Sequence, residues 1–112
     1  KICIMVGADW APATRELKKY RQDDLIIAAF KGVMMVEVRL DDWNKSEMVE
    51  AGIYTDVVPV FKMMDENAEC YGDTITGAIW GEYDTPEAMH VPLKLFFDGN
   101  TELEIKAKIV KK

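Results

Sequence analysis

The chain has 112 residues, the usual length of one domain and enough to bury a core without disulfides or metals. Its 49% hydrophobic and 30% charged residues exclude the disordered and fibrous classes. The net charge of −6 disfavours nucleic acid, whose phosphates need clustered Lys and Arg, and no apolar run reaches the roughly 18 to 20 residues that span a bilayer. We therefore expect a single soluble domain, residues 1–112, without a nucleic-acid or membrane partner.

Four elements are predicted in the first 40 residues: a strand over 2–6, helices over 12–21 and 25–30, and a strand over 33–40. The first strand is apolar without alternation, which is typical of a central parallel strand covered on both faces. Pro12 suits the first position of a helix, Asp23–Asp24 can cap the second helix, and Gly32 can end it. Because the first strand begins directly after Lys1, we expect no signal peptide, and the compartment is not predicted.

The middle of the chain predicts a helix and a hairpin. In order, the elements are a helix from Asn44 or Ser46 to Gly52, a strand over 57–64, a turn over 65–69 and an antiparallel strand over 70–79. Pro59 lies near the beginning of its strand, where sheets tolerate proline.

The C-terminal part predicts a helix and one more strand. After a loop at residues 80–83, a helix begins at Thr85–Pro86, runs to Phe97 and stops at Gly99, and Pro92 inside it predicts a kink or a later start. Residues 102–109 alternate strictly between charged and apolar side chains, which predicts a half-buried edge strand over 101–110. The domain thus divides into a core, 1–98, and an additional edge strand within 99–112.

Cysteine and histidine are scarce. Cys3 lies in the first strand and Cys70 follows the polar turn, so pairing stays open, although a free and buried Cys3 is the favoured interpretation. His90 is the one histidine, which argues against a metal site built on histidine clusters, and no cofactor is expected.

The turn after the first strand resembles a redox loop without its sulfurs. Trp10 is followed by Ala11-Pro12-Ala13-Thr14, and in the thioredoxin family a central strand ends in a Trp-Cys-x-x-Cys turn that opens a helix. The two cysteine positions of that pattern fall on Ala11 and Thr14. Neither side chain forms a thiolate, so the resemblance implies a domain that is not a disulfide oxidoreductase.

Other residues carry the same resemblance. Arg15 is basic where the family has a basic residue, Val58-Pro59-Val60-Phe61 resembles the segment with the family's cis-proline, and Gly77 falls where the family has a glycine on the last strand. The resemblance implies an α/β fold, a thioredoxin-like mixed sheet flanked by helices. Two departures are expected: the family's first strand and helix are missing, and the extra C-terminal strand fills the vacant sheet edge.

The function expected from this resemblance is that of a scaffold or a peptide-binding module. An extended peptide or protein segment would pair with the backbone of Val58 by strand addition. The expected groove consists of Trp10, Ala11, Pro12, Thr14, Val58, Pro59 and Gly77. An ordinary strand-to-helix turn without a ligand is the alternative, and both natural divergence and redesign explain the loss of the cysteines.

A catalyst of another class is the competing hypothesis. Lys62 lies inside a strand that should be central, where a lowered pKa would make it an amine nucleophile. The alternative is that its face of the sheet is open, so that Lys62 reaches solvent or pairs with a carboxylate, with Glu37 and Arg39 as neighbouring charges. His90 is a candidate general base, oriented by Glu82, Asp84 or Glu87, although a solvated or packed histidine is the more ordinary interpretation.

Overall fold

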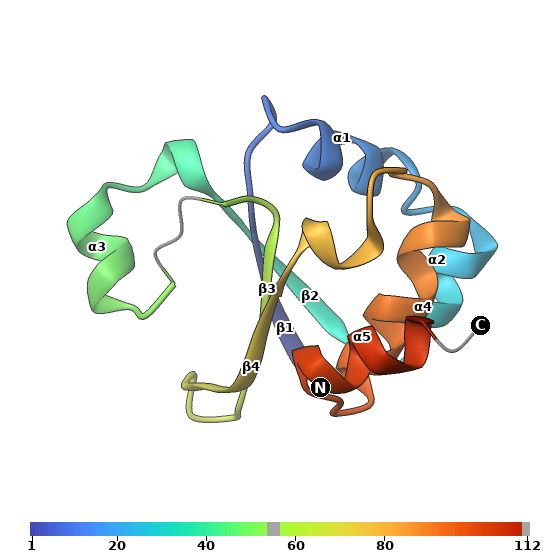
Figure 1. Ribbon diagram of the computed structural model, residues 1–112. Coiled ribbons are helices and arrows are strands. Elements are labelled where there is room, and N and C mark those ends of the chain that lie inside the picture. The colour runs from blue at the N-terminus through green and yellow to red at the C-terminus, as the bar shows by residue number, and fades with distance from the viewer. Residues whose placement is uncertain (54–56, 111–112) are drawn as a thin grey trace.

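The computed structural model describes residues 1–53 and 57–110 and shows a four-stranded mixed sheet with helices on both faces (Figure 1). The strands are β1 (Ile2–Gly7), β2 (Met34–Arg39), β3 (Val60–Met64) and β4 (Cys70–Thr76), in the order β2-β1-β3-β4. β1 runs parallel to β2, whereas β3 is antiparallel to β1 and β4 is antiparallel to β3. The α/β class expected from the sequence is confirmed.

Helices of unequal number cover the two faces. The helical elements are α1 (Pro12–Lys19), α2 (Asp24–Ala29), η1 (Leu40–Asp42), α3 (Lys45–Glu50), η2 (Gly77–Trp80), α4 (Pro86–Phe97) and α5 (Glu102–Val110). α1, α2 and α4 lie on one side of the sheet, and α3 lies on the other (Figure 1). Local caps explain several starts: Asp23 accepts a hydrogen bond from the Leu25 N–H, and Asn44, rather than Ser46, forms a capping box with Glu47.

Two hydrophobic clusters lie against the two faces. Since β1 contributes to both clusters, its unbroken apolar run is explained, and the expectation of a doubly covered central strand is confirmed. The larger cluster joins Cys3, Met5 and Phe61 of the sheet to α1, α2, α4 and α5, and the smaller cluster joins Ile4, Val6 and Val60 to Met48 and Ile53.

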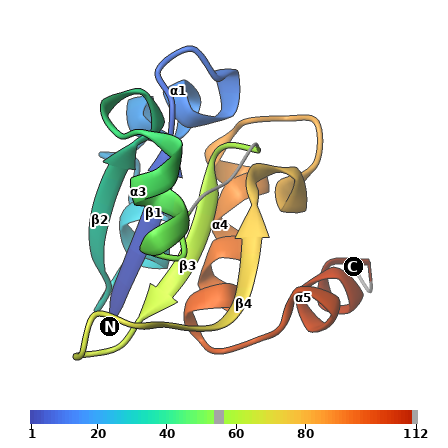
Figure 2. The same cartoon turned by 90° about the vertical axis from the view of Figure 1, so that its left-hand side faces the viewer.

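The C-terminal segment is a helix, so the prediction of an extra edge strand within 99–112 is wrong. Thr101 and Glu104 form a reciprocal cap, since the Thr101 hydroxyl accepts from the Glu104 N–H at 3.1 Å and the Glu104 carboxylate accepts from the Thr101 N–H at 3.0 Å. Ile105 is fully buried and Ile109 packs against the same core one turn later. α5 lies beside α4, at the β4 side of the molecule (Figure 2). Residues 111–112, the end of the additional segment, lie outside the described residues.

Several boundaries also differ from the prediction. α4 begins at Pro86 and continues through Pro92, so of the two alternatives given for Pro92, a kink or a later start, the later start is wrong. β4 ends at Thr76, and the following residues form η2 rather than the end of a strand. β3 begins at Val60, because Pro59 cannot donate to the ladder.

Candidate functional site

The turn after β1 lies at the same end of the sheet as Pro59 and Gly77. The register pairs the last residues of β1 with the first residues of β3, and these with the end of β4. The Gly77 N–H donates to the Pro59 carbonyl at 2.9 Å, and the peptide bond before Pro59 is cis, as the resemblance implies. Three segments that are far apart in the sequence therefore meet at one end of the sheet.

The side chains of Ala11 and Thr14, to which the resemblance assigned the cysteine positions, are inside the turn. Thr14 is 0% exposed and Ala11 is 4% exposed. The Ala8 N–H donates to the Thr14 hydroxyl at 3.5 Å, and a Cβ atom on Gly7 would lie only 2.7 Å from Cγ2 of Thr14. Thr14 therefore packs the inside of the turn, and the glycine at position 7 leaves the space that its methyl group fills.

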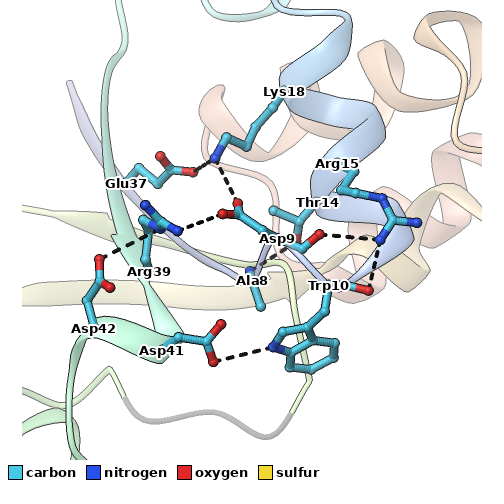
Figure 3. A network of polar contacts seen from close by, with 10 residues as sticks. All are labelled: Ala8, Asp9, Trp10, Thr14, Arg15, Lys18, Glu37, Arg39, Asp41 and Asp42. Atoms are coloured by element: carbon cyan, nitrogen blue, oxygen red, sulfur yellow. Dashed lines mark hydrogen bonds and ion pairs between the residues drawn. The ribbon is translucent and has the colours of Figure 1, made fainter.

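A network of charged side chains holds the outside of the turn (Figure 3). We call Asp9, Lys18, Glu37 and Arg39 the Asp9 network. Asp9 accepts from Lys18 Nζ at 3.2 Å and from Arg39 Nη2 at 2.7 Å, and Lys18 also contacts Glu37 at 2.9 Å. Since Lys18 belongs to α1 while Glu37 and Arg39 belong to β2, the network connects the turn to a helix and to the edge strand.

The network shifts two pKa values in opposite directions. The hydrogen bond from Lys18, with the charge of Arg39, holds the pKa of Asp9 below its usual value. The hydrogen bonds to Glu37 and Asp9 raise the pKa of Lys18. Both shifts favour the charged forms. Because these groups are exposed, the ion pairs orient the turn more than they stabilise the fold.

Trp10 projects from this turn and is 59% exposed. Its indole N–H donates to Asp41 of η1 at 3.4 Å, and its carbonyl accepts from Arg15 Nη1 at 3.1 Å (Figure 3). Arg15 Nη1 also donates to the Asp9 carbonyl at 3.3 Å. An aromatic side chain is thus presented to solvent from a backbone that is fixed by its own neighbours.

The seven residues expected to form a groove differ in accessibility. Trp10 and Pro12 are exposed, Val58 is half-buried, and the buried members are Ala11, Thr14, Pro59 and Gly77. A Cβ atom on Gly77 would lie 3.0 Å from Cδ of Pro59 and 3.2 Å from Cζ2 of Trp80. Pro59 and Gly77 therefore pack against Trp80. Of the expected groove, only Trp10, Pro12 and Val58 are accessible to a ligand.

Lys62 does not have the charge partners suggested by the sequence. The register places Lys62 on the sheet face of Val36, so Glu37 and Arg39 point to the opposite face, and that suggestion is wrong. Lys62 is half-buried, and its ammonium group donates to the Gly52 carbonyl at 2.6 Å. The amine lies at the open margin of the α3 face.

His90 and Lys62 are not brought together. His90 is half-buried on α4, which packs on the sheet face of Phe61, opposite to that of Lys62. Of the three carboxylates considered for His90, Asp84 accepts a hydrogen bond from the Trp80 indole N–H at 2.8 Å. The two catalytic candidates thus belong to separate sides of the sheet.

Both cysteines are free, with Cys3 buried and Cys70 exposed, which confirms the favoured interpretation of Cys3. Burial raises the pKa of Cys3 to about 12. In the described ranges, 1–53 and 57–110, no group of three or more His, Cys, Asp or Glu side chains is placed to hold a metal ion. Over the same ranges, no helix is long and apolar enough to cross a bilayer.

Sequence reasoning did not find Asp9, Lys18 or Asp41 as parts of this site. No motif in the sequence marks these polar residues. They meet only because β1 pairs in parallel with β2, which brings Arg39 and η1 to the turn. Comparison of the chain with protein-family models, curated proteins and solved structures finds no match to any of them.

Proposed function

We propose that this protein is a redox-inactive, thioredoxin-like domain that serves as a peptide-binding module, with Trp10 as the anchor of the site. The observation that carries the proposal is the exposure of Trp10 on a turn that Thr14 packs from inside and Asp9 holds from outside. Exposed aromatic side chains on a fixed backbone are efficient anchors, because little conformational entropy is lost when they bind.

The backbone of Val58 supports an extended peptide as the ligand. Val58 precedes β3 and, among the described residues, its N–H and C=O have no hydrogen-bond partner. β3 itself lies between β1 and β4, but Val58 lies before its paired residues, so these backbone groups can pair with an extended peptide, and Trp10 and Pro12 would contact the side chains of that peptide. The buried Pro59 and Gly77 would shape this segment rather than touch the peptide.

The redox part of the proposal is tested by insulin reduction with dithiothreitol. We expect background turnover, because the turn has no thiol and Cys3 is a buried thiol whose pKa is raised to about 12. Turnover that disappears in Cys70→Ser would instead assign redox chemistry to Cys70 and contradict the proposal.

The binding part is tested by selecting a random peptide phage library on the immobilised protein. We expect enriched peptides to bind the wild type and to lose at least about tenfold in affinity with Trp10→Ala, as for an aromatic hot spot. Tyr71→Ala is the matched control, since Tyr71 is an exposed aromatic residue on β4 near the hairpin. Equal losses in both variants, or no enrichment, would argue against a site at Trp10 and leave a scaffold without a peptide ligand.

The competing hypothesis of a catalyst gains no specific support. Lys62 and His90 lie on opposite faces of the sheet, and the Lys62 amine is directed to a backbone carbonyl.

A further inference from the structure

A cavity of about 500 Å³ lies between η2, α4 and α5, apart from the Trp10 turn. This volume is within the range of small-molecule sites, roughly 300 to 1,000 Å³. Most of its lining is apolar, with Trp80 from η2, Pro92 from α4 and Ile109 from α5. Two charged residues, Glu87 and Lys106, complete the lining.

The aromatic wall of this cavity is fixed in place. Trp80 is 6% exposed and packs edge-on against Phe61, with the ring centroids 6.0 Å apart. Its indole N–H is held by Asp84 at 2.8 Å. A ligand that enters therefore meets a preformed ring rather than a mobile side chain, which lowers the entropy lost on binding.

Pro92 removes the regular helical donor of one backbone carbonyl beside the cavity. In a regular helix the Ala88 carbonyl accepts from the N–H four residues later, but Pro92 occupies that position and has no N–H. Ala88 and Pro92 both line the cavity. The lining thus contains a carbonyl whose helical partner is missing.

The charges of the lining favour a cation. Within the part of the chain that the structure describes, the side chain of Glu87 forms no ion pair. Lys106, in contrast, is paired with Glu102 at 2.7 Å. The lining therefore includes an unpaired acid, Glu87, a residue, Ala88, whose carbonyl lacks its regular helical donor, and a lysine, Lys106, that already has a carboxylate partner.

We propose that this cavity binds a small amphipathic cation, an aromatic or branched aliphatic group that carries a protonated primary amine. The apolar part packs against Trp80 and Pro92, and the ammonium group donates to Glu87 and to the Ala88 carbonyl. The cavity lining contains none of the residues proposed to touch the peptide, Trp10, Pro12 and Val58, although its Trp80 packs near Gly77.

The test follows the Trp80 indole N–H by ¹H–¹⁵N NMR during titration with 2-phenylethylamine at pH 7. Phenylacetate is the second probe, because it keeps the ring and reverses the charge. We expect the amine to shift the Trp80 signal saturably while the Trp10 and Trp43 signals stay in place. Phenylacetate should bind at least about tenfold more weakly, since a charge-assisted hydrogen bond contributes about that factor. Equal or tighter binding of phenylacetate, or no saturable shift with the amine, would overturn the proposal.

Two variants separate the contacts from the fold. Glu87→Gln should weaken amine binding about tenfold, whereas Glu82→Gln, which removes an exposed carboxylate outside the lining, should leave it unchanged. Pro92→Ala supplies the missing N–H, which occupies the Ala88 carbonyl, so binding should weaken while the thermal midpoint shows that the fold is retained. If Pro92→Ala unfolds, Glu87→Gln at the exposed rim decides alone, and amine affinity equal to that of the wild type overturns the assignment.

Discussion

Gly7→Ala should destabilise the protein by placing a carbon atom in space that Thr14 already fills. The new Cβ would lie 2.7 Å from Cγ2 and 3.3 Å from Oγ1 of Thr14. Thr14 is fully buried in the first turn of α1, so its side chain cannot move out into solvent. Overpacking of this kind costs about 1 to 3 kcal/mol, which for a chain of this size lowers the thermal midpoint by roughly 4 °C per kcal/mol.

A double-mutant cycle isolates this contact. Thr14→Ser removes the methyl group but keeps the hydroxyl that accepts from the Ala8 N–H, and it should cost about 1 kcal/mol by itself. In that background Gly7→Ala should cost little, because its methyl group occupies the vacated space. We expect a coupling free energy of about 1 to 2 kcal/mol. Thr14→Val is the control, since it keeps a carbon atom at the Cγ2 position and should give no relief.

The assay is urea unfolding followed by far-UV circular dichroism, with the free energy of unfolding and the m value determined for each variant. Additive losses in Gly7→Ala and Thr14→Ser would refute the reasoning, because they would show that the two side chains do not share one space. Relief by Thr14→Val equal to that by Thr14→Ser would also refute it.

Three further predictions concern titration and reactivity. Because the pKa of Asp9 is lowered in the folded state, its ion pairs stabilise the protein fully above the ordinary pKa of about 3.9. This stabilisation is lost as the pH falls through the pKa of the folded state. The difference in urea midpoint between wild type and Asp9→Asn should therefore be present at pH 7, disappear in strong acid and shrink in high salt. A difference that persists in strong acid would contradict this assignment. Ellman's reagent should modify Cys70 in the native protein and Cys3 only in urea, because Cys3 is buried with its pKa raised to about 12, and two rapid equivalents without urea would be inconsistent with the fold. Borohydride trapping with a carbonyl compound at pH 7.5 should label Lys62 no more than the exposed Lys19, because the Lys62 amine donates to the Gly52 carbonyl, and selective labelling of Lys62 would revive the amine mechanism.

Local signals in the sequence predicted most of the secondary structure. The Thr85 side chain accepts from the Ala88 N–H at the start of α4, and Asp23 and Asn44 cap the helices that follow them. These contacts lie within a few residues of one another, so their spacing in the chain is enough to identify them.

The C-terminal helix shows where pattern reasoning gave the wrong element. Alternation over eight residues, 102–109, fits a strand, yet Ile105 and Ile109 are also four residues apart, and the intervening Lys and Ala are good helix formers. The decisive signal was the sequence Thr101-Glu102-Leu103-Glu104, which has the spacing of a capping box and does form one. The cap starts the helix, and the burial of Ile105 with the packing of Ile109 holds it against the core.

The Asp9 network was beyond sequence reasoning for a different reason. Its members are separated by up to 30 residues, and Arg39 reaches Asp9 only because β2 pairs in parallel with β1 in one register. A slip of one residue would turn Glu37 and Arg39 to the α3 face. The residues that define the surface of the site thus depend on tertiary pairing, whereas the residues that shape its interior are visible in the sequence.

The turn around Trp10 is fixed by side-chain contacts and not by a capping residue at the start of α1. Ala11 is the N-cap of α1 and has no side-chain oxygen, which costs about 1 kcal/mol relative to Ser or Asp. The contacts of Thr14, Asp9 and Arg15 hold the same segment without that cap. If the turn served only to start a helix, a Ser or Asp at position 11 would do so more simply. The observed arrangement instead fixes the backbone on both sides of Trp10 and leaves its indole ring in solvent, which is the arrangement that an aromatic anchor requires.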